Sequence, residues 1–201
     1  MQVQGCVFVI TGGARGLGLA IGQLIASKGA LCAIIDLDEK VAQEAASSCN
    51  SSSRGYACNV ADEKQVEEVF AKIVNDFGRL DGLINNAGIL RDGMLIKVKD
   101  GELQDKMSLS PWQSVIDVNL TGTFLCGREA AAAMAQAGNG GVIVNISSIA
   151  KSGNIGQSNY AATKAGVASL VTTWSRELAR FKIRAVGIAP GVISTDMTDS
   201  M

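Results

Sequence analysis

The sequence predicts an α/β domain in which a doubly wound parallel sheet is flanked by helices on both faces. Three observations point to this fold class. Six short runs are almost continuously apolar, as strands buried on both faces are. Longer segments of helical character separate these runs along the chain. A glycine-rich stretch joins the first apolar run to the first helical segment, where such sheets carry a phosphate-binding loop.

The elements are expected to alternate along the chain. Strands are predicted at residues 6–11, 31–35, 55–60, 80–85, 141–147 and 183–189. Helices are predicted at residues 16–28, 38–48, 62–77, 111–137 and 157–180. Asp62 is expected to cap the third helix. Ser110 followed by Pro111 predicts an N-cap and a first helical residue for the fourth.

One segment interrupts this alternation. Residues 97–107 read KVKDGELQDKM, with an Asp-Gly pair between two charged flanks. Such a pair is typical of a two-residue hairpin turn, so we expect a surface β-hairpin before the fourth helix. The chain has no internal repeat and no linker-like stretch, so residues 1–201 are expected to form a single domain.

The composition indicates which classes of partner and which cellular compartment to expect for this protein. The formal net charge of the 201-residue chain is −1 and its pI is near 5.5, which gives no reason to expect nucleic acid or an anionic membrane surface as a partner. Because no apolar run is long enough to span a bilayer and no signal-peptide pattern is present, a cytoplasmic protein is expected. Five cysteines without CxxC spacing and no histidine indicate reduced thiols and no metal site.

The stretch TGGARGLG, residues 11–18, predicts a dinucleotide site. Gly12, Gly16 and Gly18 stand where a tight turn and a close approach to a pyrophosphate leave no room for a Cβ atom. The N-terminus of the following helix offers unpaired N–H groups and partial positive charge to the phosphates. The place of this motif between the first strand and the first helix makes it more specific than a glycine-rich loop alone.

Asp36, at the end of the second predicted strand, bears on the choice of dinucleotide. A carboxylate there accepts hydrogen bonds from the adenosine ribose hydroxyls and repels a 2′-phosphate, which favours NAD(H). Arg15 favours NADP(H) instead, because a guanidinium in the loop can pair with that phosphate. A third interpretation is that Asp36 only caps the following helix.

Tyr160 and Lys164 lie four residues apart in a run of good helix formers, in a chain without histidine. A free phenol has a pKa of about 10, too high for a base at neutral pH. A nearby ammonium and a cationic nicotinamide would stabilise the phenolate and lower that pKa. One helical turn places both side chains on the same face. The spacing is compatible with a tyrosine that acts as an acid and base. A YxxxK pair found alone would instead be interpreted as a half-buried aromatic residue and a solvated charge, and the dinucleotide loop upstream makes that interpretation less favourable.

Six motifs together resemble the short-chain dehydrogenases/reductases, whose fold is a Rossmann-like α/β domain. The motifs are TGGARGLG, NNAG (85–88), NLTG (119–122), NISS (145–148), YAATK (160–164) and PGVISTDM (190–197). They occur in the order and spacing of that family over essentially the whole chain. The nearest resemblance, through NNAGILRD, GQSNYAATKAG and APGVISTDMT, is to the 3-oxoacyl-[acyl-carrier-protein] reductase branch.

The resemblance implies four catalytic residues. Tyr160 is the general acid in ketone reduction and the general base in alcohol oxidation, and Lys164 also binds the nicotinamide ribose. A serine holds and polarises the substrate carbonyl. The segment between Ser148 and Tyr160 is one residue shorter than the spacing most common in the family. Applying that spacing backward from Tyr160 therefore selects Ser147, whereas aligning the end of the strand selects Ser148. We expect Ser148 to be the catalytic serine, because loops absorb deletions more readily than strands do. Asn119 binds a water that connects the lysine to solvent.

The resemblance also implies the residues that bind NAD(P)(H). Asn59 replaces a more usual aspartate at the adenine, and its amide oxygen can still accept from the adenine amino group. No metal is implied. The expected cofactor contacts are Gly12, Arg15, Gly16, Leu17, Gly18, Asp36, Leu37, Asn59, Val60, Asn86, Ala87, Gly88, Tyr160, Lys164, Pro190, Gly191, Ile193 and Thr195.

The implied reaction is hydride transfer between NAD(P)(H) and a ketone or secondary alcohol, with a 3-oxoacyl thioester as the leading substrate. A hydroxysteroid or other secondary-alcohol dehydrogenase is the alternative. The acidic acyl-carrier protein is a possible partner, and its candidate contacts are Arg128, Arg176 and Arg180. The resemblance suggests a homotetramer with the 111–137 and 157–180 helices in one interface.

Relatives usually continue beyond the position of Met201 through a substrate lid and a last strand, which this sequence lacks. If the chain truly ends there, we expect an unpaired sheet edge, an open site and a dinucleotide-binding protein with little turnover.

Overall fold

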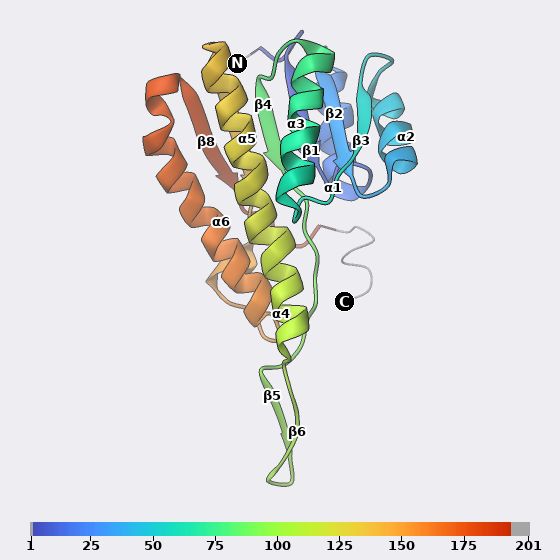
Figure 1. The fold of residues 1–201 in the computed structure, drawn as a ribbon. Helices are drawn as coiled ribbons and strands as arrows, with labels where there is room; N and C mark the ends of the chain where they lie inside the picture. The colour runs from blue at the N-terminus through green and yellow to red at the C-terminus, as the bar shows by residue number, and fades with distance from the viewer. Residues whose placement is uncertain (1, 194–201) are drawn as a thin grey trace.

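The computed structural model describes residues 2–193 and contains a six-stranded parallel sheet between two layers of helices (Figure 1). Its strands are β1 (Val7–Thr11), β2 (Leu31–Asp36), β3 (Arg54–Ala57), β4 (Gly82–Asn85), β7 (Gly141–Ile146) and β8 (Ile183–Ile188). Their spatial order is β3-β2-β1-β4-β7-β8. The order reverses between β1 and β4, where doubly wound sheets bind their ligands beyond the carboxyl ends of the strands. The predicted fold class is confirmed.

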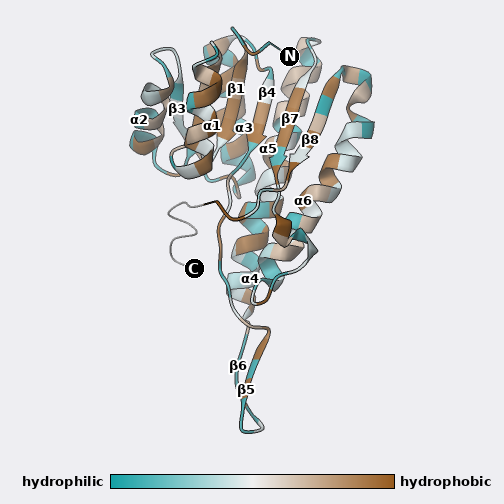
Figure 2. Ribbon diagram, turned by 180° about the vertical axis from the view of Figure 1, so that it is seen from behind, coloured by the Kyte–Doolittle hydropathy of each residue, from teal (hydrophilic) through white to brown (hydrophobic). Residues whose placement is uncertain are grey.

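Alternate residues of each central strand face two separate apolar cores. In β1, Val7 and Val9 pack toward α3 (Glu63–Phe77), α5 (Gly122–Ala137) and α6 (Ser158–Glu177). Phe8 and Ile10 pack on the other face, toward α1 (Gly16–Ala26) and α2 (Glu39–Cys49). Burial on both faces explains why the strand sequences are apolar without alternation, as the hydrophobic colour of β1, β4 and β7 in Figure 2 makes visible.

The helix boundaries agree with the predictions except around the fourth helix. The Asp62 carboxylate accepts a hydrogen bond from the Gln65 N–H at 3.0 Å and caps α3 as predicted. In contrast, α4 (Leu109–Ile116) begins after Ser108, so the prediction of Ser110 as N-cap is wrong and Pro111 is the third helical residue. Proline is tolerated there because the N–H groups of a first turn have no partner within the helix.

The predicted helix 111–137 is interrupted in the structure. After α4 the chain makes a π-helical turn at Asp117–Thr121 and then continues as α5. A π-helical turn widens the helix locally and moves its carbonyl groups out of the regular α-helical register. Such turns are frequent at functional sites, and this one contains Asn119.

The predicted surface hairpin is present as β5 (Ile96–Lys99) and β6 (Glu102–Lys106), which extend from the body in Figure 1. Asp100 and Gly101 form the turn with φ values of 53° and 81°. Two positive φ values are the signature of the hairpin turn that Asp-Gly favours. Every residue of both strands is exposed, so the hairpin adds nothing to the apolar cores.

Two surface features of residues 2–193 are relevant to possible partners. No helix in this part of the chain is long and apolar enough to cross a membrane. Strand β8 forms one edge of the described sheet, and Val186 and Ile188 are partly exposed on it.

Candidate active site

A cleft of about 590 Å³ lies at the carboxyl ends of the central strands. Its lining includes residues from five of the six motifs described above, all except NLTG (119–122). The predicted residues that line it are Gly12, Arg15, Gly16, Leu17, Asp36, Leu37, Asn59, Val60, Asn86, Ala87, Gly88, Ser148, Tyr160, Lys164, Pro190, Gly191 and Ile193. Gly18 and Asn119 are buried behind its walls. Thr195 lies outside the described residues.

The glycine loop is packed so tightly that two of its residues admit no side chain. A Cβ atom on Gly12, whose φ is +59°, would lie 2.9 Å from the Cα atom of Ala87. On Gly18, it would lie 2.5 Å from the carbonyl oxygen of Gly12. The Asn86 amide donates to the carbonyl oxygens of Thr11 at 3.0 Å and Gly12 at 2.9 Å, which ties the loop to the end of β4.

Thr11 is a residue whose contribution sequence reasoning missed. Its hydroxyl oxygen accepts hydrogen bonds from the N–H groups of Asn86 at 3.0 Å and Ala87 at 3.1 Å. It is buried at the end of β1, where its side chain joins the two strands on either side of the crevice. The sequence signal that could have identified Thr11 is its position as a polar residue at the end of an otherwise apolar strand.

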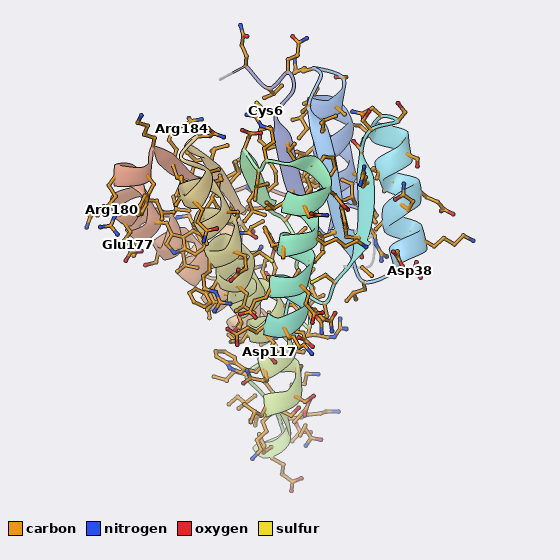
Figure 3. All side chains as sticks on the ribbon, turned by 45° about the horizontal axis from the view of Figure 1, so that its top comes forward. Cys6, Asp38, Asp117, Glu177, Arg180 and Arg184 are labelled. Atoms are coloured by element: carbon orange, nitrogen blue, oxygen red, sulfur yellow. The ribbon has the colours of Figure 1, made fainter. Side chains whose placement is uncertain are left out.

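The structure excludes the interpretation of Asp36 as a helix cap. The cap of α2 is Asp38, which lies at the start of that helix in Figure 3 and accepts from the Val41 N–H at 3.0 Å. The two carboxylate oxygens of Asp36 accept from the N–H groups of Ala14 at 3.2 Å and Leu37 at 2.9 Å. Asp36 therefore ties β2 to the glycine loop while it lines the cleft.

Tyr160 and Lys164 lie one turn apart near the start of α6. The Lys164 ammonium lies 5.4 Å from the centroid of the Tyr160 ring and donates to the carbonyl oxygen of Ile146 at 2.8 Å. Lys164 is only 5% exposed, and this desolvation lowers its pKa to about 8.

Burial raises the pKa of the Tyr160 phenol, a hydrogen bond with Ser148 lowers it, and the Asp92 carboxylate raises it again. The sequence led us to expect a lowered pKa because of Lys164. In the structure the ammonium lies over the face of the ring and bonds to a backbone carbonyl, so burial of the phenol has the larger effect.

The two serines of the NISS motif have different surroundings. Ser147 is buried, and its hydroxyl donates to the backbone carbonyl of Lys164 at 2.8 Å. Ser148 is partly exposed in the cleft, where its hydroxyl oxygen accepts from the Ala150 N–H at 3.1 Å and its side chain hydrogen-bonds the Tyr160 phenol. Ser148 is therefore the serine available to a substrate beside Tyr160.

Asn119 is fully buried, and its side chain holds the outer wall of the cleft. Its amide oxygen accepts from the Ile89 N–H at 2.8 Å, and its amide nitrogen donates to the Ile89 carbonyl at 3.0 Å. This pairing fixes the loop that follows β4. Asn119 thus sits where the π-helical turn, the NNAG loop and the cleft meet.

A second set of contacts fastens the same loop to the start of α6. The Gln157 amide donates to the Asp92 carboxylate at 2.8 Å, and the Gly93 N–H donates to the Gly156 carbonyl at 2.8 Å. The Asn159 amide donates to the Arg91 carbonyl at 2.8 Å. Gln157 and Asn159 are both buried. Their proximity to Tyr160 in the sequence was the only signal that could have identified them.

The three arginines considered as partner contacts lie away from this cleft or are already paired. Arg128 forms ion pairs with Glu63 at 2.6 Å, Glu67 at 3.0 Å and Glu129 at 2.7 Å. Arg176 lies sixteen residues beyond Tyr160 in the same helix, about 24 Å away at 1.5 Å per residue. Arg180 follows in the turn after α6, and Figure 3 shows it at the left edge of the molecule beside Glu177.

Comparison with known proteins agrees with this geometry. The model of the family described as short chain dehydrogenase matches residues 6–201. The 3-oxoacyl-[acyl-carrier-protein] reductase of Thermotoga maritima is 39% identical, in an alignment that covers 100% of this chain and 79% of the relative. The reductase of the same name from Escherichia coli (strain K12) is 35% identical over 100% of this chain and 79% of its own length. The one from Staphylococcus aureus (strain N315) is 38% identical over 96% of this chain and 76% of its own.

Proposed function

Because this chain belongs to the short chain dehydrogenase family, we propose that it reduces 3-oxoacyl thioesters to 3-hydroxyacyl thioesters. The family membership makes it an oxidoreductase that acts on CH–OH groups with NAD(P). The observation that carries the proposal is the convergence of Ser148, Tyr160 and Lys164 in the cleft that also contains the glycine loop. The choice of substrate is supported by the names of relatives that are 35% to 39% identical.

The residues of the cleft fit a nicotinamide dinucleotide. Gly12 and Gly16 line the cleft and present backbone without a Cβ atom to a pyrophosphate, and the N-terminus of α1 adds its partial positive charge. Asp36, Asn59 and Val60 line the adenosine end, whereas Pro190, Gly191 and Ile193 lie toward Tyr160 and would contact the nicotinamide. When bound, the dinucleotide supplies or accepts the hydride.

In the proposed mechanism the chain's own side chains orient the substrate and supply the proton. The Ser148 hydroxyl donates a hydrogen bond to the substrate carbonyl oxygen and holds it beside the Tyr160 phenol. Tyr160 gives its proton to that oxygen as the alcohol forms. Lys164, charged below its pKa of about 8, stabilises the phenolate that remains. Asn119 acts by holding the wall of the cleft and the π-helical turn.

We further propose NAD(H) as the preferred cofactor, supported by the carboxylate of Asp36 at the place that a 2′-phosphate would occupy. Arg15 lines the same part of the cleft and is the residue through which NADP(H) would be accommodated. Because Asp36 also holds the glycine loop through the Ala14 N–H, its role is not confined to the ribose.

The proposal includes an acyl-carrier protein as the carrier of the substrate, on the strength of the relatives' names. A cytoplasmic location is supported by five free cysteines, all within the described residues. The proposal includes a homotetramer that uses α5 and α6, which the resemblance suggests.

The test is an initial-rate comparison of NADH and NADPH over acetoacetyl thioesters, steroids and quinones. We expect thioester reduction with NADH as the better cofactor. Tyr160→Phe should lower turnover by about 10²- to 10⁴-fold and leave the Kd for NADH unchanged. The matched control is Tyr56→Phe, since Tyr56 bonds Asp76 beside α3 and lies outside the cleft. Undiminished turnover in Tyr160→Phe, or a preference for steroids, would contradict the proposal.

A further inference from the structure

Asn159 is a fully buried polar residue that directly precedes Tyr160 in the first turn of α6. Its amide nitrogen donates to the carbonyl oxygens of Arg91 at 2.8 Å and Pro111 at 3.3 Å. Its amide oxygen accepts from the Tyr160 N–H at 2.7 Å. Burial of an amide is costly unless hydrogen bonds replace those lost to water, and here both ends of the amide are bonded. The Asn159 side chain therefore has one defined place among its neighbours.

The partners of Asn159 come from segments that are remote in the sequence. Arg91 follows β4 and lines the cleft, at a separation of 68 residues. Pro111 is in α4, at a separation of 48 residues. Gln157 also reaches the loop after β4, through Asp92, but in residues 2–193 no hydrogen bond other than that of Asn159 joins α6 to α4. One side chain thus connects the wall of the cleft and a neighbouring helix to the first turn of α6.

The backbone of Tyr160 lies between two anchored points of α6. One turn beyond it, the Lys164 ammonium donates to the Ile146 carbonyl and the Ser147 hydroxyl donates to the Lys164 carbonyl, each at 2.8 Å. These two bonds attach the helix to the end of β7. On the N-terminal side of Tyr160, Asn159 attaches the helix to the loop after β4 and to α4. The two attachments together determine how the turn that carries Tyr160 is oriented in the cleft.

The orientation of this turn matters because proton transfer depends closely on distance. The Tyr160 phenol must meet a substrate oxygen that is held by Ser148, which belongs to a different segment of the cleft. The two oxygen atoms have to approach to about 2.6 to 3.2 Å. A misplacement of about 1 Å can lower the rate about 10²-fold. Without Asn159 the attachment at Lys164 would remain, but the N-terminal turn would lose its bonds to Arg91 and to α4.

We propose that Asn159 is a positioning residue that fixes the Tyr160 phenol against the substrate by joining the first turn of α6 to the cleft wall and to α4. The inference rests on the proposed role of Tyr160 as the catalytic acid. Asn159 does not line the cleft, so it acts through Tyr160 and needs no contact with substrate or dinucleotide.

The kinetic test is a double-mutant cycle of Asn159→Ala and Tyr160→Phe, with the best of the thioesters, steroids and quinones as substrate. Asn159→Ala should lower kcat about 10- to 100-fold and leave KM and the Kd for NADH within about threefold, because it misplaces the acid and touches neither ligand. In the Tyr160→Phe protein the same change should lower kcat less than about threefold, because the group that Asn159 positions is absent. Undiminished kcat in Asn159→Ala, or an equal loss in both backgrounds, would overturn the inference.

Asn50→Ala is the matched control for a loss of stability. Asn50 follows α2 outside the cleft, and its amide donates to the Ala30 carbonyl at 2.9 Å. The control should lower the urea midpoint as Asn159→Ala does and leave kcat unchanged, and an equal loss of kcat would show that Asn159 only stabilises the fold. If Asn159→Ala does not fold, Asn159→Ser, which keeps a hydroxyl donor and leaves a smaller gap, replaces it under the same criteria.

An NMR measurement tests the position of Tyr160 without turnover. The chain contains two tyrosines, so tyrosine labelled at Cζ gives two signals, and Tyr160→Phe identifies the one from Tyr160. With NADH bound, Asn159→Ala should shift or broaden the Tyr160 signal, whereas Asn50→Ala should leave it unchanged. An unchanged Tyr160 signal in Asn159→Ala contradicts the inference alone, whereas undiminished turnover in Tyr160→Phe contradicts the proposed function.

Discussion

Lys164 is a buried cation, and its replacement by methionine should stabilise the protein at neutral pH. Desolvation lowers the Lys164 pKa from 10.5 to about 8. Each pKa unit corresponds to about 1.4 kcal/mol, so the shift lowers the free energy of unfolding by about 3 kcal/mol at pH values where the lysine is charged in both the folded and the unfolded chain. Methionine fills a similar volume without a charge but loses the hydrogen bond to the Ile146 carbonyl, which costs about 1 kcal/mol. The expected net gain at pH 7 is about 2 kcal/mol.

The sign of the pH dependence follows from proton binding. Between pH 8 and 10.5 the unfolded chain holds the lysine proton and the folded chain does not. The contribution of Lys164 to stability therefore rises with pH across that window, and the cost has largely gone by pH 10. The advantage of Lys164→Met should accordingly shrink from about 2 kcal/mol at pH 7 to near zero at pH 10.

Urea unfolding at both pH values, at one protein concentration, measures this difference. At pH 7 the midpoint of the variant should lie about 1 M above that of the unmodified protein, at an m value of about 2 kcal/mol per M. Lys28→Met is the control, because Lys28 is exposed, and it should change stability by less than about 0.5 kcal/mol at either pH. The reasoning is refuted if Lys164→Met is less stable at pH 7, or if its advantage is the same at pH 7 and pH 10.

Two further predictions concern the paired serines and the hairpin. Ser148→Ala should lower kcat about 10²- to 10³-fold, because it removes the donor to the substrate oxygen. Ser147→Ala should keep kcat within a few-fold and lower the free energy of unfolding by about 1 kcal/mol, because the Ser147 hydroxyl donates to the Lys164 carbonyl and not to the substrate. Kinetics and urea unfolding measure the two effects. A large loss of kcat in Ser147→Ala with little change in Ser148→Ala would exchange the two roles. Replacing residues 96–106 by a two-glycine turn should leave the melting temperature unchanged. The hairpin is exposed, and the Met107 N–H donates to the Leu95 carbonyl at 3.1 Å, so the two ends of the deleted segment already lie together. A large fall in the melting temperature would show that the hairpin packs on the body of the protein.

Much of the site could be predicted because it depends on local chemistry. The glycine loop, the carboxylate at the end of β2 and the tyrosine–lysine pair one turn apart each occupy a short stretch of sequence. The topology of a parallel sheet then brings strand ends together at one edge, so residues from Gly12 to Ile193 share a cleft. The roles of individual neighbours could not be predicted. Asn119 bonds Ile89, and Gln157 bonds Asp92, across 30 and 65 residues of sequence, and no periodicity encodes such pairs.

The sequence by itself determined the alternation of strands and helices, the cap at Asp62, the Asp-Gly hairpin and the place of the dinucleotide loop. Each of these follows from steric and hydrogen-bonding preferences within a few residues. Only the tertiary structure decided which serine hydroxyl is buried against a backbone carbonyl and which is partly exposed beside Tyr160, which aspartate caps α2, and that Lys164 is buried beside Tyr160. Burial, desolvation and the distance between charges depend on segments remote in the chain, and these quantities set the proton chemistry of Tyr160.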